Sequence, residues 1–153
     1  MSLLGIDIGT SCCKASLFRT DGVMIRCARR RYELRRDAAG GVVLPSEEVW
    51  RKIREVIAEA AAAAGEDPVR ALCTASMGEA VVPFDGAGRI LGDSVTGLDA
   101  RGDRFLEHLM RRISPDVLYR ITGLLPAPGF TLTNLLWLRE AQPELWRNTA
   151  FFL

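Results

Sequence analysis

The sequence predicts an α/β domain with a mixed sheet that starts as a β-meander and is flanked by helices. Three observations predict this class. Three strand-like apolar runs follow one another in residues 3–34, a long helical segment then leads to a fourth apolar run, and the residues beyond it are mainly helical. Strands followed by helices around one sheet are typical of α/β proteins.

The opening strands are expected at residues 3–8, 12–19 and 23–34. Asp21-Gly22 supplies the tight hairpin turn between the second and the third. A basic run at residues 26–36 falls in the third strand, and we interpret it as a solvent face with Tyr32 and Leu34 turned inward. Because no aromatic stacking platform accompanies these arginines, we expect no nucleic-acid partner.

A helix is expected over residues 47–64, where apolar residues recur at helical spacing. Ser46 is predicted to cap this helix, two acids follow against its positive end, and Gly65 is predicted to end it. Trp50 falls on the apolar face and is predicted to be a core residue. Residues 69–74 then form a strand parallel to the first, which makes the helix a βαβ crossover.

The second half is predicted to contain extended segments at residues 80–84 and 89–91, joined by a turn. Helices follow at residues 99–112, 114–121, 131–140 and 143–147. The single histidine, His108, lies in the first of these helices. We interpret it as a surface or packing residue rather than a catalytic base.

The composition is that of one globular domain of 153 residues, with 48% hydrophobic and 25% charged residues. A formal net charge of +1 favours neither nucleic acid nor an anionic membrane. The cysteines at positions 12, 13, 27 and 73 lack zinc-ligand spacing and are expected to be free thiols or small core residues. No apolar run reaches the roughly 18 residues needed to cross a bilayer, and no signal pattern precedes Gly5, so no membrane association and a cytoplasmic location are expected.

The turn between the first two strands carries the most chemistry. Asp7 ends a buried apolar run, and Gly9 allows a sharp turn. Thr10 and Ser11 offer hydroxyls and main-chain N–H groups as a nest of donors, and Lys14 adds a cation. Asp7 can hold a metal ion through oxygen ligands or water. This tip is therefore predicted to hold a nucleotide phosphate; a plain hairpin turn is the alternative.

A second candidate site follows the strand at residues 69–74. In open α/β sheets ligands bind beyond the carboxyl ends of strands, which places Glu79 like a substrate ligand. An exposed turn acid is the alternative. Asp99 and Arg101, two residues apart at a helix start, fit an N-cap aspartate beside a solvated arginine.

Five segments in order resemble the FGGY carbohydrate kinases, members of the actin-like ATPase superfamily with a ribonuclease-H-like fold. The first is Gly5-Ile6-Asp7-Ile8-Gly9-Thr10-Ser11, followed by Lys14 and residues 18–22. The others are residues 75–80, Asp99-Ala100-Arg101, the run from Thr122-Gly123 through Pro128-Gly129-Phe130 to Leu135-Leu136-Trp137, and Pro143-Glu144. Many actin-like ATPases share the first segment, whereas five in order are much more specific.

The resemblance implies transfer of the γ-phosphoryl group of ATP to a sugar or polyol hydroxyl, with ATP and Mg²⁺ as cofactors. Asp7 would hold Mg²⁺ through water. The residues implied around the phosphates are Gly9, Thr10, Ser11, Cys12 and Lys14. Those implied at the sugar are Met77, Gly78, Glu79, Asp99, Arg101 and Phe130. Gly97 stands where the family has a tryptophan that walls the sugar pocket, so a wider pocket is expected.

An FGGY kinase resembles two actin-like domains facing each other, and residues 1–153 resemble the N-terminal one only. We therefore expect a truncated domain that lacks the general base of the reaction and is inactive by itself. Apolar surface around Trp146, Phe151, Phe152 and Leu153 is expected to be bare, causing self-association or a homo-oligomer. The alternative functions are another actin-like phosphotransferase or ATPase, and a non-catalytic ligand-binding or interaction domain.

Overall fold

The computed structural model describes the chain from residue 1 to residue 153, and the chain divides into two compact units. The first unit contains residues 1–34 and 45–77, and the second contains residues 35–44 and 78–153. Each unit has strands and at least one helix of its own.

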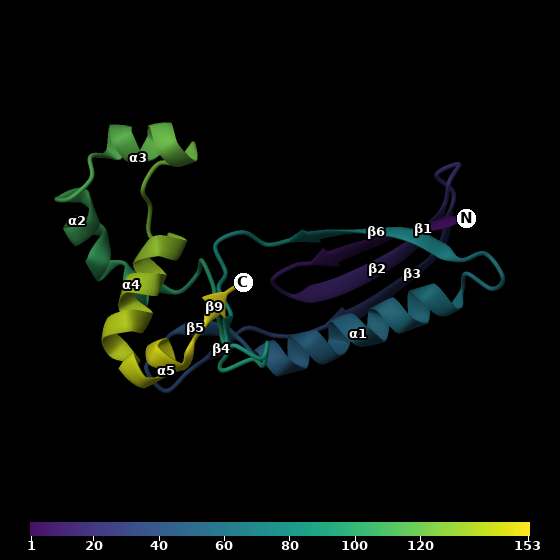
Figure 1. Cartoon of the computed structure of the whole chain (residues 1–153), viewed down its shortest axis with the longest axis horizontal. Coiled ribbons are helices and arrows are strands. Elements are labelled where there is room, and N and C mark those ends of the chain that lie inside the picture. Colours follow the sequence, from purple (N-terminus) through teal and green to yellow (C-terminus); the bar gives the residue numbers. More distant parts are fainter. The chain divides into compact units, whose positions relative to one another are not determined.

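The first unit is a four-stranded sheet with one long helix lying along it (Figure 1). Its elements are β1 (Ser2–Ile8), β2 (Cys12–Arg19), β3 (Met24–Arg31), α1 (Ser46–Ala62) and β6 (Val69–Ser76). The strand order is β3-β2-β1-β6, with β1 antiparallel to β2, β2 antiparallel to β3, and β1 parallel to β6. The predicted meander and βαβ crossover are therefore confirmed.

One face of this sheet is buried against α1. Side chains alternate between the two faces along a strand. The alternate residues with little or no exposed surface are Leu4 and Ile6 of β1 and Cys13, Ala15 and Leu17 of β2. α1 contacts β1, β2 and β3, and its buried side chains include Ile53, Val56 and Ala60. Asp7 and Lys14 alternate with the buried strand residues and therefore lie on the opposite face.

Part of the predicted basic surface is paired with α1. Arg26 Nη2 lies 2.5 Å from Glu59 Oε1, and Arg30 contacts Glu59 at 2.9 Å and Glu55 at 3.1 Å. The hydrogen bonds that Arg30 donates to Glu59 and Glu55 raise the pKa of its guanidinium group. These arginines therefore contribute to the packing of the helix on the sheet.

Several expectations for this unit were wrong in detail. β3 ends at Arg31 rather than at residue 34. Pro45, not Ser46, takes the N-cap position of α1, because the Pro45 carbonyl accepts the Val49 N–H at 2.9 Å. Trp50 is 50% exposed rather than buried. It lies about 100° around the helix from Val49, beside the narrow stripe that faces the sheet.

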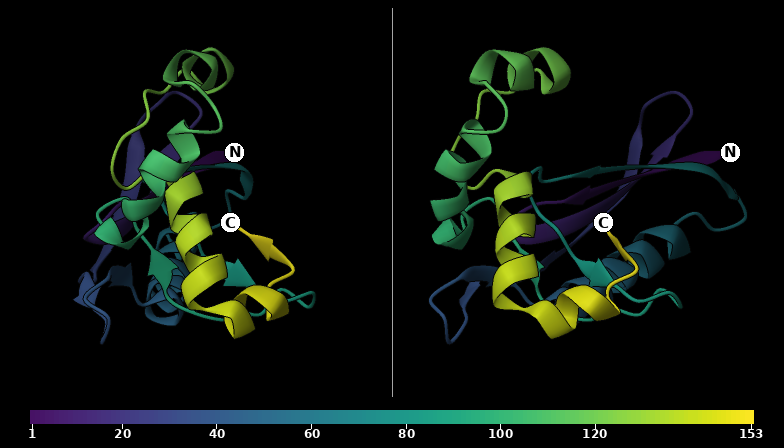
Figure 2. Two further views of the ribbon diagram at one scale, coloured as in Figure 1. Left: turned by 90° about the vertical axis from the view of Figure 1, so that its left-hand side faces the viewer. Right: turned by 60° about the vertical axis from the view of Figure 1, so that its left-hand side comes forward.

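The second unit contains two small sheets and the remaining helices (Figure 2). The three-stranded sheet consists of β4 (Arg35–Arg36), β5 (Val42–Leu44) and β8 (Ser94–Val95), and the two-stranded sheet consists of β7 (Pro83–Phe84) and β9 (Phe151–Phe152). The helices are the 3₁₀ helix η1 (Ala100–Gly102), α2 (Arg104–Met110), α3 (Pro115–Thr122), α4 (Thr131–Ala141) and α5 (Pro143–Asn148). In Figure 2, α5 leads from the end of α4 into β9.

The core of the second unit forms where α4 meets the small sheets. Its buried members are Val81, Val95, Trp137 and Leu138, and the partly buried residues packed on them include Phe105, Leu145, Trp146 and Phe152. The rings of Trp146 and Phe152 are 5.4 Å apart. Of the terminal residues expected to be bare, only Phe151 and Leu153 are exposed.

The helices of the second unit agree with prediction except at residues 99–112. That segment is divided into η1 and α2, with Asp103 between them. α3 has the predicted start, because the Ser114 side chain accepts the Val117 N–H at 3.3 Å, and left-handed Gly123 ends it. No helix of the chain combines the length and the apolar character that crossing a bilayer would require.

Candidate functional site

The tip of the β1–β2 hairpin presents unused hydrogen-bond donors. The Gly9 N–H donates to the Cys12 carbonyl at 3.0 Å and closes the turn. Thr10 and Ser11 are exposed, and their main-chain N–H groups make no hydrogen bond within the chain. Such a turn has the donors needed for a phosphate oxygen.

Asp7 and Lys14 face each other beside this tip. They are direct partners across β1 and β2, and Lys14 Nζ donates to Asp7 Oδ2 at 3.0 Å. Their side chains are 51% and 41% exposed, so both charges are within reach of a ligand. The hydrogen bond from Lys14 to Asp7 raises the pKa of the lysine ammonium, which stays charged at neutral pH.

The two neighbouring cysteines have little exposed surface. Cys13 is buried against α1, and burial raises the pKa of its thiol. Cys12 is 7% exposed, and its carbonyl is taken by Gly9. Cys12 therefore contributes to the turn through its backbone.

Asp7 is the acidic residue of this turn that fits a magnesium ion. No group of three or more His, Cys, Asp or Glu side chains is close enough in this structure to hold a metal. Mg²⁺ commonly binds through one or two carboxylates and keeps waters and substrate phosphates as its other ligands. A single exposed carboxylate beside exposed N–H donors suits that coordination.

The turn after β6 crosses from the first unit to the second. Met77 belongs to the first, and its N–H donates to the Ile8 carbonyl at 3.0 Å. Glu79 belongs to the second and has a positive φ of 53°. Its Oε2 accepts hydrogen bonds from the backbone N–H of Thr131 and, at 2.5 Å, from the Thr131 hydroxyl. Glu79 is therefore half-buried and bound to the start of α4, with Oε1 left without a partner.

Gly97 lies in a closely packed place. A Cβ atom at Gly97 would stand 2.9 Å from the Cβ of Glu79 and 3.3 Å from its carbonyl oxygen. Gly129, with φ +76°, approaches so closely that a side chain there would overlap the Gly97 carbonyl. Backbone atoms and Glu79 therefore leave little room for the Cβ atom of any other residue at this position. Phe130, half-buried, follows Gly129 directly.

Asp99 is fully buried, and its carboxylate accepts hydrogen bonds from other groups of the chain. It accepts the Val42 N–H at 2.9 Å, the Arg101 N–H at 2.9 Å and the Arg101 Nη2 at 2.6 Å. Asp99 is thus the N-cap of η1, as one interpretation predicted. The arginine is not solvated, since its side chain is only 12% exposed.

Arg101 also contacts a residue that the sequence did not single out. Its Nη1 donates to Asp37, and its Cζ lies 3.8 Å from the centroid of the Trp137 ring. Burial by itself would raise the pKa of Asp37, but the Gly41 N–H and the Arg101 guanidinium outweigh it and lower that pKa. Asp99 and Arg101 therefore hold residues 37–42 beside α4, and neither carries a free polar group toward solvent.

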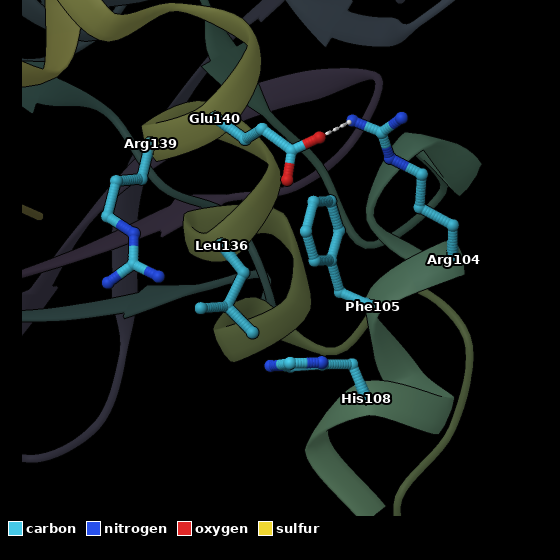
Figure 3. A pocket seen from close by; sticks show the side chains of 6 residues that line it. All are labelled: Arg104, Phe105, His108, Leu136, Arg139 and Glu140. Atoms are coloured by element: carbon cyan, nitrogen blue, oxygen red, sulfur yellow. Dashed lines mark hydrogen bonds and ion pairs between the residues drawn. The ribbon is translucent and has the colours of Figure 1, made fainter.

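A pocket of about 490 Å³ lies between α2 and α4, apart from these predicted residues. It is lined by Arg104, Phe105, His108, Leu136, Arg139 and Glu140. Figure 3 shows the Arg104 guanidinium turned toward Glu140, at 2.9 Å, and the Arg139 side chain on the far side of Leu136. Arg104 and Glu140 are both more than half exposed, so this pocket is a surface hollow with a satisfied ion pair.

Besides Asp37, two residues of these sites were not predicted from the sequence. Thr131 binds Glu79 across 52 positions, and Tyr32 donates its hydroxyl to the Gly9 carbonyl at 2.6 Å. Tyr32 was expected to point inward but was given no role. The available signal was its position directly after β3, which pairs with β2 and so brings Tyr32 close to the β1–β2 turn.

The fold and the hairpin tip define an α/β domain of the actin-like ATPase class. Residues 2–153 match the FGGY family of carbohydrate kinases, N-terminal domain, and the chain belongs to that family. A probable L-xylulose kinase from Pasteurella multocida is 25% identical over 152 residues, which are 98% of this chain and 32% of that protein.

Solved structures agree with this assignment. Xylulose kinase from Rhodospirillum rubrum superposes with a TM-score of 0.88 at 25% identity, over 99% of this chain and 32% of that one. Glycerol kinase from Plasmodium falciparum, solved with ADP, superposes with a TM-score of 0.82 at 16% identity, over 95% of this chain and 30% of that one. The chain therefore spans about a third of the length of the proteins it matches.

Proposed function

We propose that this chain is the N-terminal part of an ATP-dependent carbohydrate kinase, which transfers the γ-phosphoryl group of ATP to a sugar or polyol hydroxyl. The observation that carries the proposal is the hairpin tip, where exposed N–H donors lie beside Asp7 and Lys14 in an FGGY domain. The related proteins are named for xylulose and glycerol, which supports a sugar or polyol as acceptor.

The chain's own residues would bind and orient the phosphates. The N–H groups of Thr10 and Ser11 would donate to phosphate oxygens, and Gly9 would let the backbone come close. Lys14 would exchange its contact with Asp7 for one with a phosphate, which frees the carboxylate. Asp7 would then hold Mg²⁺ through water, and a metal in this position neutralises charge that develops on the transferred group.

The sugar would bind at the turn after β6 and the start of α4. The free Oε1 of Glu79 is an acceptor for a hydroxyl, and Met77, Gly78 and Phe130 are the neighbouring residues in our proposal. Asp99 and Arg101 would support this site without contacting the sugar, because their polar groups are engaged within the second unit. The general base is expected outside residues 1–153, so this chain by itself should phosphorylate no sugar.

Binding of Mg·ADP to the ¹⁵N-labelled chain tests the nucleotide part of this proposal. Titration should shift the amide resonances of Thr10 and Ser11, and Asp7→Asn should weaken the binding about tenfold, a typical effect of removing one charged contact. Asp21→Asn is the matched control, because Asp21 is another exposed hairpin acid paired with a neighbouring base, Arg19, at 2.6 Å. Shifts confined to other parts of the chain, or equal binding by both variants, would contradict the proposal.

We also propose that the chain self-associates and acts in the cytoplasm, where ATP is available. Large apolar side chains are prominently exposed at Ile121 (70%), Leu125 (70%) and Leu153 (72%). Sedimentation of the chain at tens of micromolar measures this directly, and a clean monomer would contradict it.

A further inference from the structure

Tyr32 holds the phosphate-binding turn at two points. Its N–H donates to the Ser11 carbonyl at 3.1 Å, and its hydroxyl donates to the Gly9 carbonyl at 2.6 Å. The residue is only 3% exposed. Lys52 of α1 donates to the carbonyl of Arg31, the residue just before, so the backbone at this point is tied to the helix.

These two contacts set the direction of the donors at the tip. A peptide group is planar and trans, so its C=O and N–H point in opposite directions. When Tyr32 draws the Gly9 carbonyl inward, the Thr10 N–H of the same peptide turns outward. That N–H has no partner within the chain and lies on an exposed residue. The buried hydroxyl thus determines which way an exposed donor faces.

We propose that Tyr32 is the positioning residue of the phosphate-binding turn, and that it acts through its hydroxyl rather than through its ring. This inference rests on the proposed function, because it assigns Tyr32 to the nucleotide site formed by that turn. Tyr32 touches no substrate itself; it aims the Thr10 N–H at the phosphate.

The hydroxyl suits this role because it remains protonated. Burial, chiefly, raises the pKa of Tyr32 above its ordinary value. The hydroxyl therefore stays a donor to Gly9 around neutral pH. The orientation of the turn should not depend on pH between about 6 and 9, because this range lies below even the ordinary tyrosine pKa of about 10.

Tyr32→Phe removes only the oxygen and is the direct test. Mg·ADP affinity should fall about fivefold, the size of one net hydrogen bond. In the ligand-free chain the ¹³C resonance of the Gly9 carbonyl should move, and the amide order parameters of residues 9–11 should fall. Tyr119→Phe is the matched control, since the only other tyrosine is 51% exposed on α3, and it should change none of these quantities.

The outcomes separate this inference from the proposed function. If the unaltered chain shows no response of the turn to Mg·ADP, the kinase proposal fails, and the ligand-free measurements on Tyr32→Phe still decide the role of Tyr32. An unmoved Gly9 carbonyl with unchanged order parameters overturns the inference, as does Mg·ADP affinity equal to that of the unaltered chain. Should Tyr32→Phe not fold, the unaltered chain supplies the test: a slowly exchanging Tyr32 hydroxyl proton supports the inference, and a rapidly exchanging one overturns it.

Discussion

Glu79 binds the first residue of α4 through a single oxygen, because Oε2 accepts both the N–H and the hydroxyl of Thr131. The first N–H groups of a helix have no partner inside it, and an acid there also complements the helix dipole. Phe130, at the N-cap, supplies no side-chain cap. The Glu79 carboxylate, from a turn distant in sequence, therefore caps the N-terminus of α4 in place of a local side chain.

Glu79→Gln should lower the free energy of unfolding by about 1–2 kcal/mol, because a charge-assisted pair of hydrogen bonds is weakened. Urea unfolding measures the change. Glu140→Gln is the control: its bond to Arg104 joins two side chains that are 60% and 58% exposed, and its loss should cost less than about 0.5 kcal/mol. Equal costs for the two variants would show that Glu79 does not cap α4.

The contact between Gly97 and Gly129 predicts a graded effect of added methyl groups. Gly129→Ala should destabilise the chain by about 2 kcal/mol or more, because the position has a left-handed backbone and no room for a side chain. Gly97→Ala should cost about 1–3 kcal/mol through its overlap with Glu79. Gly86→Ala, where no atom lies within 4 Å, should be near neutral. Thermal unfolding that ranks Gly86→Ala with the other two would contradict this packing.

Asp37 predicts an acid dependence of stability. Its pKa in the folded chain lies below the ordinary value, so the unfolded chain binds a proton at a higher pH than the folded chain does. The stabilisation is therefore complete above the ordinary aspartate pKa of about 4 and is lost as the pH falls through the lowered folded value. We expect the free energy of unfolding, measured in urea between about pH 2 and 6, to depend less on pH for Asp37→Asn than for the unaltered chain. If the free energy of unfolding changed with pH in the same way for both chains, Asp37 would not be a source of the acid dependence.

Most of the first unit could be predicted because its signals are local. Apolar runs separated by Asp21-Gly22 gave the meander, and the helix between two such runs gave the crossover. Trp50 was wrongly predicted to be buried, because the helical spacing of apolar residues does not separate a residue in the buried stripe from one beside it. Only the packing of α1 on the sheet distinguishes the two.

The second unit was harder to predict because long-range contacts determine its arrangement. Asp99 and Arg101 are close in sequence, and their spacing allowed a cap or a ligand pair. Their burial depends on Asp37, which lies 64 positions from Arg101. The space at Gly97 likewise depends on the backbone of Glu79 and Gly129. No pattern within one segment contains this information. The exposed groups of the hairpin tip could be predicted because they lie within eight positions, from Asp7 to Lys14, whereas the contact of Tyr32 with Gly9 spans 23 positions and was missed.

The Arg101 guanidinium restricts how this sequence can evolve. It lies where any side chain at Gly41 would stand, it binds Asp37 and Asp99, and it rests on the Trp137 ring. These four contacts share one guanidinium, so a change at any of the partners alters the surroundings of the others. These positions should therefore covary among related sequences, and a residue larger than glycine at position 41 should occur where the arginine at position 101 is replaced or its guanidinium has moved away.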